Sequence, residues 1–268
     1  MKTTVVINKS QLELLKFIAK YRLVTVSQVQ QNFGYKSRPS VNNKLKRLVT
    51  SGLVGMKYDG SKKMTGVPAV FYLTPRGLRE VKKHLEYITE AIIHAAYSDH
   101  NASDALVEEC GELFSLAKSL QRNYPNMKVL TARQLADIGY FPRPLPELYL
   151  AHPLENDVQR FFVFNLRDVK RYDIDLRYCI AKLIAYRESE AYAESGNEFP
   201  IIMLVCHSAT IEKLAQRVMR TALNKSYESM VVYTTSYQAL AKLQGTAQPI
   251  WSSIDDPETL LTLEEIEA

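Results

Sequence analysis

Hydrophobic residues in the first third of the chain recur at the three- and four-residue spacing of amphipathic helices. This spacing predicts helices over residues 10–21, 27–34 and 39–52. The second helix is expected to end at Gly34, because glycine tolerates the positive φ of a helix end. The apolar stripes of the three helices are Leu12, Leu15 and Ile18; Val26, Val29 and Phe33; and Val41, Leu45, Leu48 and Val49.

Two short apolar runs follow, at 53–58 and 67–73, and a polar loop with two glycines separates them. This pattern predicts a β-hairpin. Thr74 and Pro75 then predict the start of a fourth helix, because threonine caps helices well and proline suits the first turn. We expect helical structure to continue from about residue 80 to 98.

The remaining two thirds of the chain alternate strand-like apolar runs with helical segments. The expected strands are 129–132, 147–151, 160–166, 199–206 and 229–234, and the expected helices are 105–123, 178–193 and 209–222. This alternation predicts an α/β fold with a mixed central sheet, α+β when the first third is included. The predicted organisation is a domain over 1–85, a linking helix over 86–104, an α/β domain over 105–250 and a loosely attached acidic tail over 251–268.

Charge is distributed unevenly along the chain. Residues 1–90 hold 17 Lys+Arg and 5 Asp+Glu, a net +12, whereas the other 178 residues hold 17 basic and 24 acidic groups, a net −7. This asymmetry predicts that the first third binds a polyanion. The alternative is surplus lysine that serves solubility alone.

The third helix carries the most informative polar face. On a helical wheel, the side opposite the apolar stripe carries cations, an amide and hydroxyls but no carboxylate. A helix face that only meets solvent usually carries both positive and negative charges. Arginine can bridge two acceptors of guanine, and asparagine can pair with adenine. We therefore expect this face to contact DNA. It comprises Ser40, Asn43, Lys46, Arg47 and Thr50, with Lys44 on its flank.

Three helices and a basic hairpin resemble the winged helix-turn-helix family over about residues 8–85. The resemblance rests on Leu45-Lys46-Arg47-Leu48, Ser51-Gly52-Leu53-Val54 and Tyr72-Leu73-Thr74-Pro75-Arg76-Gly77. It implies that the third helix enters the major groove of double-stranded DNA and that the wing touches the neighbouring backbone. Protein docking by the winged helix is the alternative. The candidate DNA-binding residues are Arg38, Ser40, Asn43, Lys44, Lys46, Arg47, Lys57, Lys62 and Lys63.

The second part of the chain resembles the replication-relaxation family of plasmid proteins, which join a winged helix to a degenerate restriction-endonuclease-like domain. The resembling residues are Pro146-Glu147-Leu148-Tyr149-Leu150, 161–166, Lys182-Leu183-Ile184-Ala185-Tyr186 and 199–205. The resemblance implies a DNA-binding accessory protein at an origin of transfer or replication. The partners it implies are a relaxase or replication protein, and a homodimer is a further candidate.

Nucleases of this fold hold Mg²⁺ with an acid on one strand and an acid-x-lysine on the next. Glu147 fits the first position, but Asn165 and Arg167 align with the second acid and the lysine. An amide brings no charge, so we expect an inactive scaffold. The shifted frame Asp168-Val169-Lys170 keeps a site-directed nuclease open as an alternative.

Other chemistry finds little support in the sequence. The three cysteines form no Cys-x-x-Cys pair, and no phosphate-binding glycine loop is present. We expect no cofactor, no metal, no membrane association and a cytoplasmic location. A transcriptional regulator with a dimerising or ligand-sensing α/β domain is the remaining alternative.

Overall fold

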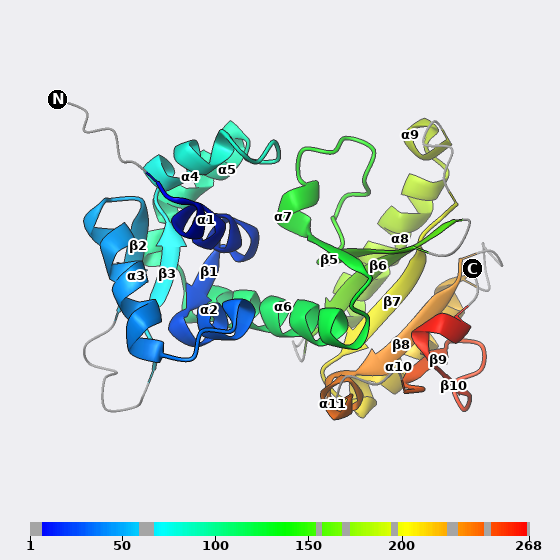
Figure 1. The fold of residues 1–268 in the computed structure, drawn as a ribbon. Helices are drawn as coiled ribbons and strands as arrows, with labels where there is room; N and C mark the ends of the chain where they lie inside the picture. The colour runs from blue at the N-terminus through cyan, green and yellow to red at the C-terminus, as the bar shows by residue number, and fades with distance from the viewer. Residues whose placement is uncertain are drawn as a thin grey trace. The chain divides into compact units, whose positions relative to one another are not determined.

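The chain divides into two units, Met1–Leu116 and Ala117–Ala268, and the boundary falls within one helix, α6 (Asp104–Asn123). The computed structural model describes residues 7–58, 67–153, 157–167, 172–193, 198–223, 230–243 and 248–266. Figure 1 traces both units along the chain.

The first unit combines helices with a small antiparallel sheet in the order β1-β3-β2. This is a winged helix-turn-helix arrangement, in which α2 and α3 form the helix pair and β2 and β3 the arms of the wing. The elements are α1 (Lys9–Tyr21), β1 (Leu23–Thr25), α2 (Val26–Phe33), α3 (Arg38–Thr50), β2 (Val54–Lys57), β3 (Val70–Leu73), α4 (Pro75–Lys82), α5 (Glu90–Ala95) and the 3-10 helix η2 (Ala96–Asn101).

Local capping explains where these helices begin and end. The α2 helix starts after Thr25, whose hydroxyl accepts from the Gln28 amide, and ends at Gly34 with φ +66°. The α1 helix starts before the predicted Ser10, because Asn8 and Gln11 form a capping box. The strand β1 was not predicted from the sequence, since three residues are too few for a periodic signal.

The continuous helix expected from residue 80 to 98 is wrong. The α4 helix ends at Lys82, and α5 starts at Glu90, after Thr89 accepts a hydrogen bond from the Ile92 amide. Ile88 lies between them and is fully buried. The linking helix expected over 86–104 is replaced by α5 and the 3-10 helix η2, because Ile88 is buried in the core and Thr89 caps a new helix.

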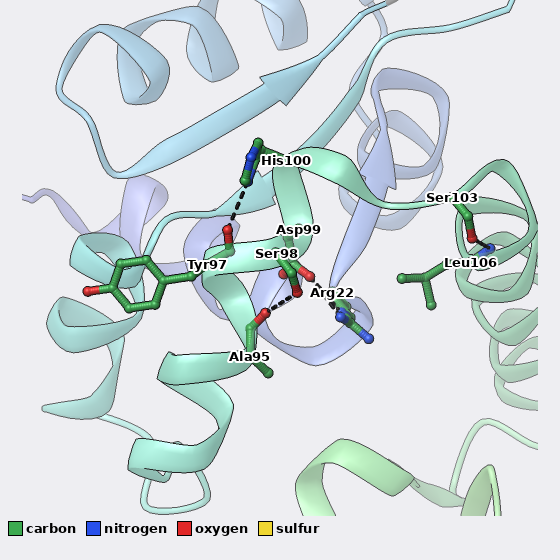
Figure 2. Close-up of polar contacts among 8 residues, drawn as sticks. All are labelled: Arg22, Ala95, Tyr97, Ser98, Asp99, His100, Ser103 and Leu106. Atoms are coloured by element: carbon green, nitrogen blue, oxygen red, sulfur yellow. Dashed lines mark hydrogen bonds and ion pairs between the residues drawn. The ribbon is translucent and has the colours of Figure 1, made fainter.

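An ion pair fastens η2 to the end of α1. Arg22 follows α1 with φ +66°, and its Nε and Nη2 donate to Oδ1 of Asp99 over 3.0 and 2.8 Å. Figure 2 shows the guanidinium and the carboxylate facing each other. Asp99 is only 2% exposed, so breaking this pair would leave buried polar groups without their partner.

The second unit is built on a seven-stranded mixed sheet, in the order β10-β9-β8-β7-β6-β5-β4. The meander β4-β5-β6 is antiparallel, and β6, β7 and β8 are parallel to one another. The order is helix α6, the antiparallel meander β4-β5-β6, the crossover helix α8 and the parallel strand β7. This is a restriction-endonuclease-like α/β arrangement. The elements are β4 (Lys128–Thr131), α7 (Ala132–Leu135), β5 (Leu148–Pro153), β6 (Val158–Leu166), α8 (Tyr172–Arg187), α9 (Glu190–Ala193), β7 (Ile201–Cys206), α10 (Ala209–Leu223), β8 (Val232–Ser236), α11 (Tyr237–Lys242), β9 (Trp251–Ser253), β10 (Leu260–Leu261) and the 3-10 helix η3 (Leu263–Glu265).

Central strands of this sheet are buried on both faces. All six residues of β7 are buried, as expected for a parallel strand covered on each side. The helices α8 and α10 pack against Phe162 and Phe164 of β6 and Ile202 and Leu204 of β7. In the part of the chain that the structure describes, no helix is long and apolar enough to cross a bilayer.

The acidic tail is packed against the domain, so the expected loose attachment is wrong. Its strand β9 pairs with β8, and Trp251, Leu263 and Ile266 are at most 2% exposed. The described acids of the tail are exposed, whereas Trp251, Leu263 and Ile266 between and beside them are in the core. Composition alone therefore concealed the tail's contribution to the fold.

Candidate nucleic-acid interface

The α3 helix separates its apolar and polar residues onto opposite sides. The Ser37 hydroxyl accepts from the Ser40 amide and caps the helix, and Pro39 lies in the first turn. Val41, Leu45 and Leu48 are at most 1% exposed and pack into the first unit. Their burial fixes which side of α3 faces outward.

That outward side matches the expected DNA-contacting face. Arg38, Ser40, Asn43, Lys46, Arg47 and Thr50 are all exposed. Among the described residues, no carboxylate forms an ion pair with Arg38, Lys46 or Arg47. Every position from 14 to 58 is free of Asp and Glu in the sequence, so acids near in sequence cannot neutralise this face. We call the six exposed residues the α3 face.

Lys44 is held at the edge of the α3 face by an aromatic support. Its Nζ lies 4.5 Å from the Tyr35 ring centroid and donates to the Tyr35 hydroxyl over 3.4 Å and to the Ser10 hydroxyl over 3.5 Å. Phe33 stacks on the same ring at 5.6 Å. Tyr35 thus positions a cation without neutralising it. Sequence reasoning missed Tyr35, although its place directly after the α2 helix end was a usable signal.

The wing residues expected to touch DNA fall into two groups. Lys57 is turned inward, since its Nζ lies 3.6 Å from the Asp104 carboxylate and donates to the Ala102 carbonyl. It therefore stabilises the first unit and is left out of the candidate interface. Lys62 and Lys63 lie outside the described residues, and their role stays a prediction.

Glu147, the first acid of the nuclease-like pattern, lies just before β5 and faces α8. Burial and then the nearby Glu147 carboxylate raise the pKa of the Cys179 thiol to about 12. Cys179 is a partly buried residue of α8 and packs against the core of the second unit. Glu147 is therefore part of a partly buried environment in which a carboxylate and a thiol are neighbours.

Asn165, the amide at the expected acid position, belongs to the central part of the sheet. It pairs in register with Val205 of β7 and is 9% exposed. Strand alternation points its side chain to the face of Phe161 and Val163, opposite to the face that α8 covers. Asp168 and Lys170 lie outside the described residues. Within the described ranges, no group of three His, Cys, Asp or Glu could hold a metal ion.

Comparisons with known proteins leave the family open. No family profile and no curated protein matches the chain, so membership of the replication-relaxation family stays a prediction. A mutant form of ZitR from Lactococcus lactis is 15% identical over 44% of this chain and 77% of its own, with a TM-score of 0.26. The restriction endonuclease FokI is 12% identical over 90% of this chain and 44% of its own, with a TM-score of 0.31. At these scores neither similarity bears on function, and the fold description rests on the topology above.

Proposed function

We propose that this protein binds double-stranded DNA through the α3 face. The observation that carries the proposal is the exposure of Arg38, Lys46 and Arg47 on a helix whose opposite side is fully buried. Such a helix can enter a major groove without disturbing the core. The net +12 of residues 1–90 supplies the attraction to phosphate.

The positions along α3 suggest a division of labour. Ser40, Asn43 and Arg47 follow one another at spacings of three and four residues, so they share one stripe of the helix. Hydroxyl, amide and guanidinium groups on that stripe are suited to base edges. Lys46 and Arg38 flank it and are suited to phosphates, which position a protein without reading sequence.

Beyond duplex binding, we propose a non-enzymatic accessory role at an origin of transfer or replication on a plasmid or mobile element. The protein would mark the site and recruit a relaxase or replication protein. The resemblance to the replication-relaxation family supports the location. The amide Asn165 at the expected acid position supports the lack of cutting, because it adds no charge for Mg²⁺.

The test is a binding footprint of the full chain on fragmented host and plasmid DNA. We expect enrichment at one or a few sites beside an origin. Enrichment at promoters instead would favour a transcriptional regulator, and even coverage of all fragments would contradict site recognition. Cleaved ends at the bound sites in the presence of Mg²⁺ would contradict the non-enzymatic role.

Matched variants assign the footprint to the α3 face. Arg47→Ala should abolish the enriched sites, because a bidentate base contact is worth about 1–3 kcal/mol. Arg217→Ala is the control, since Arg217 is also an exposed arginine on a helix but lies on α10. Equal loss in both variants would overturn the assignment.

A further inference from the structure

The second unit contains a cavity of about 380 Å³ that is rich in aromatic side chains. It lies beside the meander β4-β5-β6, below the chain that follows α7 and next to the end of α8 and α9. Six aromatic side chains line it: Tyr140, Phe141, Tyr149, Phe162, Tyr186 and Tyr192. The 16 tyrosines looked scattered in the sequence, yet four of them meet here.

Strand register builds one wall of the cavity. Tyr149 of β5 pairs with Phe162 of β6, so their rings share a face of the sheet, with centroids 6.1 Å apart. Phe141 meets Tyr149 edge to face at 5.2 Å. Tyr186 of α8 and Tyr192 of α9 also line the cavity, and their ring centroids are 5.7 Å apart. The rings are held by one another, so the cavity presents fixed aromatic surfaces.

Two cations line the same cavity and one acid lies with them. Lys128 of β4 and Arg160 of β6 are each in register with Ala151 of β5, so both flank the same point of the central strand. Glu198 is the acid. A surplus of positive charge disfavours a quaternary ammonium ligand, which aromatic cages otherwise suit. It favours a ligand that joins a flat ring to an anionic group.

The phenols add neutral donors. Burial, and then neighbouring tyrosines, raise the pKa of Tyr186 to about 12. Burial also raises the pKa of Tyr149, while Arg160 acts in the opposite direction. Both hydroxyls stay protonated at neutral pH, and each can donate to a ring nitrogen, a carbonyl or a phosphate oxygen.

We infer that this cavity binds a single nucleotide, with its base stacked among the tyrosines and its phosphate at Lys128 and Arg160. A volume of 380 Å³ is at the small end of ligand pockets, which suits one nucleotide better than a dinucleotide. The nucleotide can be a free mononucleotide or an unpaired one in a single strand. The inference is independent of the α3 face.

Titration calorimetry of the full chain tests the inference. The probes are the four deoxynucleoside monophosphates, inorganic phosphate alone and a single-stranded homopolymer. Tyr140→Ala should weaken binding by about 5- to 150-fold, the range for one lost base stack, and Tyr140→Phe should restore it. Lys128→Ala should weaken binding several-fold and reduce its salt dependence.

Matched controls separate the cavity from the general surface. Tyr178 is an exposed tyrosine of α8 outside the cavity and Lys213 an exposed lysine of α10, so Tyr178→Ala and Lys213→Ala should change nothing. Binding of monophosphates identifies a free nucleotide, and binding of the homopolymer alone identifies a single strand. Binding of phosphate alone with equal affinity, no binding of any nucleotide, or equal loss in the control variants would overturn the inference. Arg47→Ala should leave nucleotide binding unchanged, which keeps this test apart from that of duplex binding.

Discussion

The polar side chains of the two candidate regions, the α3 face and the nuclease-like pattern, lie in different surroundings. On α3 the cations Arg38, Lys46 and Arg47 point outward, and no described carboxylate pairs with them. In the second unit, two carboxylates are partly buried. Glu147 lies close to Cys179 of α8, and Glu212 of α10 accepts a hydrogen bond from the Thr234 hydroxyl. Of the nuclease-like pattern, the described residue Glu147 is thus partly buried rather than exposed.

This difference teaches that exposure separates binding groups from structural ones more sharply than residue type does. Lys57 and Lys46 are both lysines of the basic first unit, yet Lys57 contacts Asp104 and Lys46 is exposed without a described ion pair. Substituting an outward-facing residue of the α3 face should lower the affinity for DNA. Substituting an inward-facing polar residue should change the free energy of unfolding or the reactivity of a neighbouring side chain.

Thiol chemistry should show the largest effect. With its pKa raised to about 12 from the ordinary 9.0, Cys179 holds roughly a thousandfold less thiolate near neutral pH than an ordinary thiol. A thiolate of higher pKa is also a stronger nucleophile, which offsets about half of this deficit, so we expect a disulfide reagent to label Cys179 about one to two orders of magnitude more slowly in the native protein than in the unfolded chain. Peptide mass spectrometry identifies the labelled residue.

The Glu147→Gln variant sharpens this prediction. Burial is the main cause of the raised pKa and Glu147 the second, so the variant should label only slightly faster. Its affinity for duplex DNA should not change. Prompt labelling of native Cys179 would show that this face of α8 is open to solvent.

Asp99→Asn should have the next largest effect, on stability. The variant leaves Arg22 without a countercharge, and a broken buried pair costs about 3–5 kcal/mol; with Arg22 one third exposed we expect about 2–3 kcal/mol. Urea unfolding measures the loss. The outward residue provides the contrast, because Arg47→Ala should change stability by only about 0.5 kcal/mol. Comparable losses in the two variants would break the rule.

Most of the first unit could be predicted from the sequence because its signals are local. The Gly34 helix end, the Ser37–Pro39 start of α3 and the stripe Val41–Leu45–Leu48 are each set by neighbours a few residues away. The outward α3 face follows from that stripe. The inward turn of Lys57 did not follow, because its partner Asp104 is 47 positions further along the chain.

The second unit was predictable in class but not in its site. Buried runs such as Ile201–Cys206 indicated the sheet, since a parallel strand needs apolar residues on both faces. The aromatic cavity was not predicted, because Tyr149 and Tyr186 meet only through strand register and the α8 crossover. The burial of Trp251 and Ile266 was not predicted either, because the acidic residues around them suggested an exposed tail.

Lys46→Ala should have a smaller effect, confined to DNA binding. Removing one phosphate contact should weaken binding several-fold for specific and random duplexes alike, and reduce the slope of log affinity against log salt by about 0.9. Fluorescence anisotropy at several salt concentrations measures both. Lys213→Ala is the control, an exposed lysine on α10 whose loss should leave the slope unchanged. A loss confined to the specific site would instead make Lys46 a base-reading residue.

The smallest effect should come from Glu212, whose carboxylate is turned into the second unit. Its Oε1 accepts from the Thr234 hydroxyl over 3.0 Å, and Gln216 donates to Thr234 and Ser252 over 2.8 and 3.0 Å. Burial raises the pKa of Glu212 above its ordinary value, while the hydrogen bonds act against that rise. The folded state therefore binds this proton more tightly than the unfolded state. Its contribution to stability falls as pH rises through the interval above 4.5.

Glu212→Gln keeps the acceptor for Thr234 and removes the ionisation. We expect the variant to match the parent protein near pH 4.5, to be more stable than the parent at neutral pH, and to show a flatter pH profile between the two. Urea unfolding at both pH values measures the difference. A loss of stability that is larger at neutral pH than near pH 4.5 would mean that the hydrogen bonds hold the carboxylate charged in the folded state. In that case Glu212 would be a charge held inside the second unit by its hydrogen bonds, and the contrast with the exposed charges of the α3 face would fail at its weakest point.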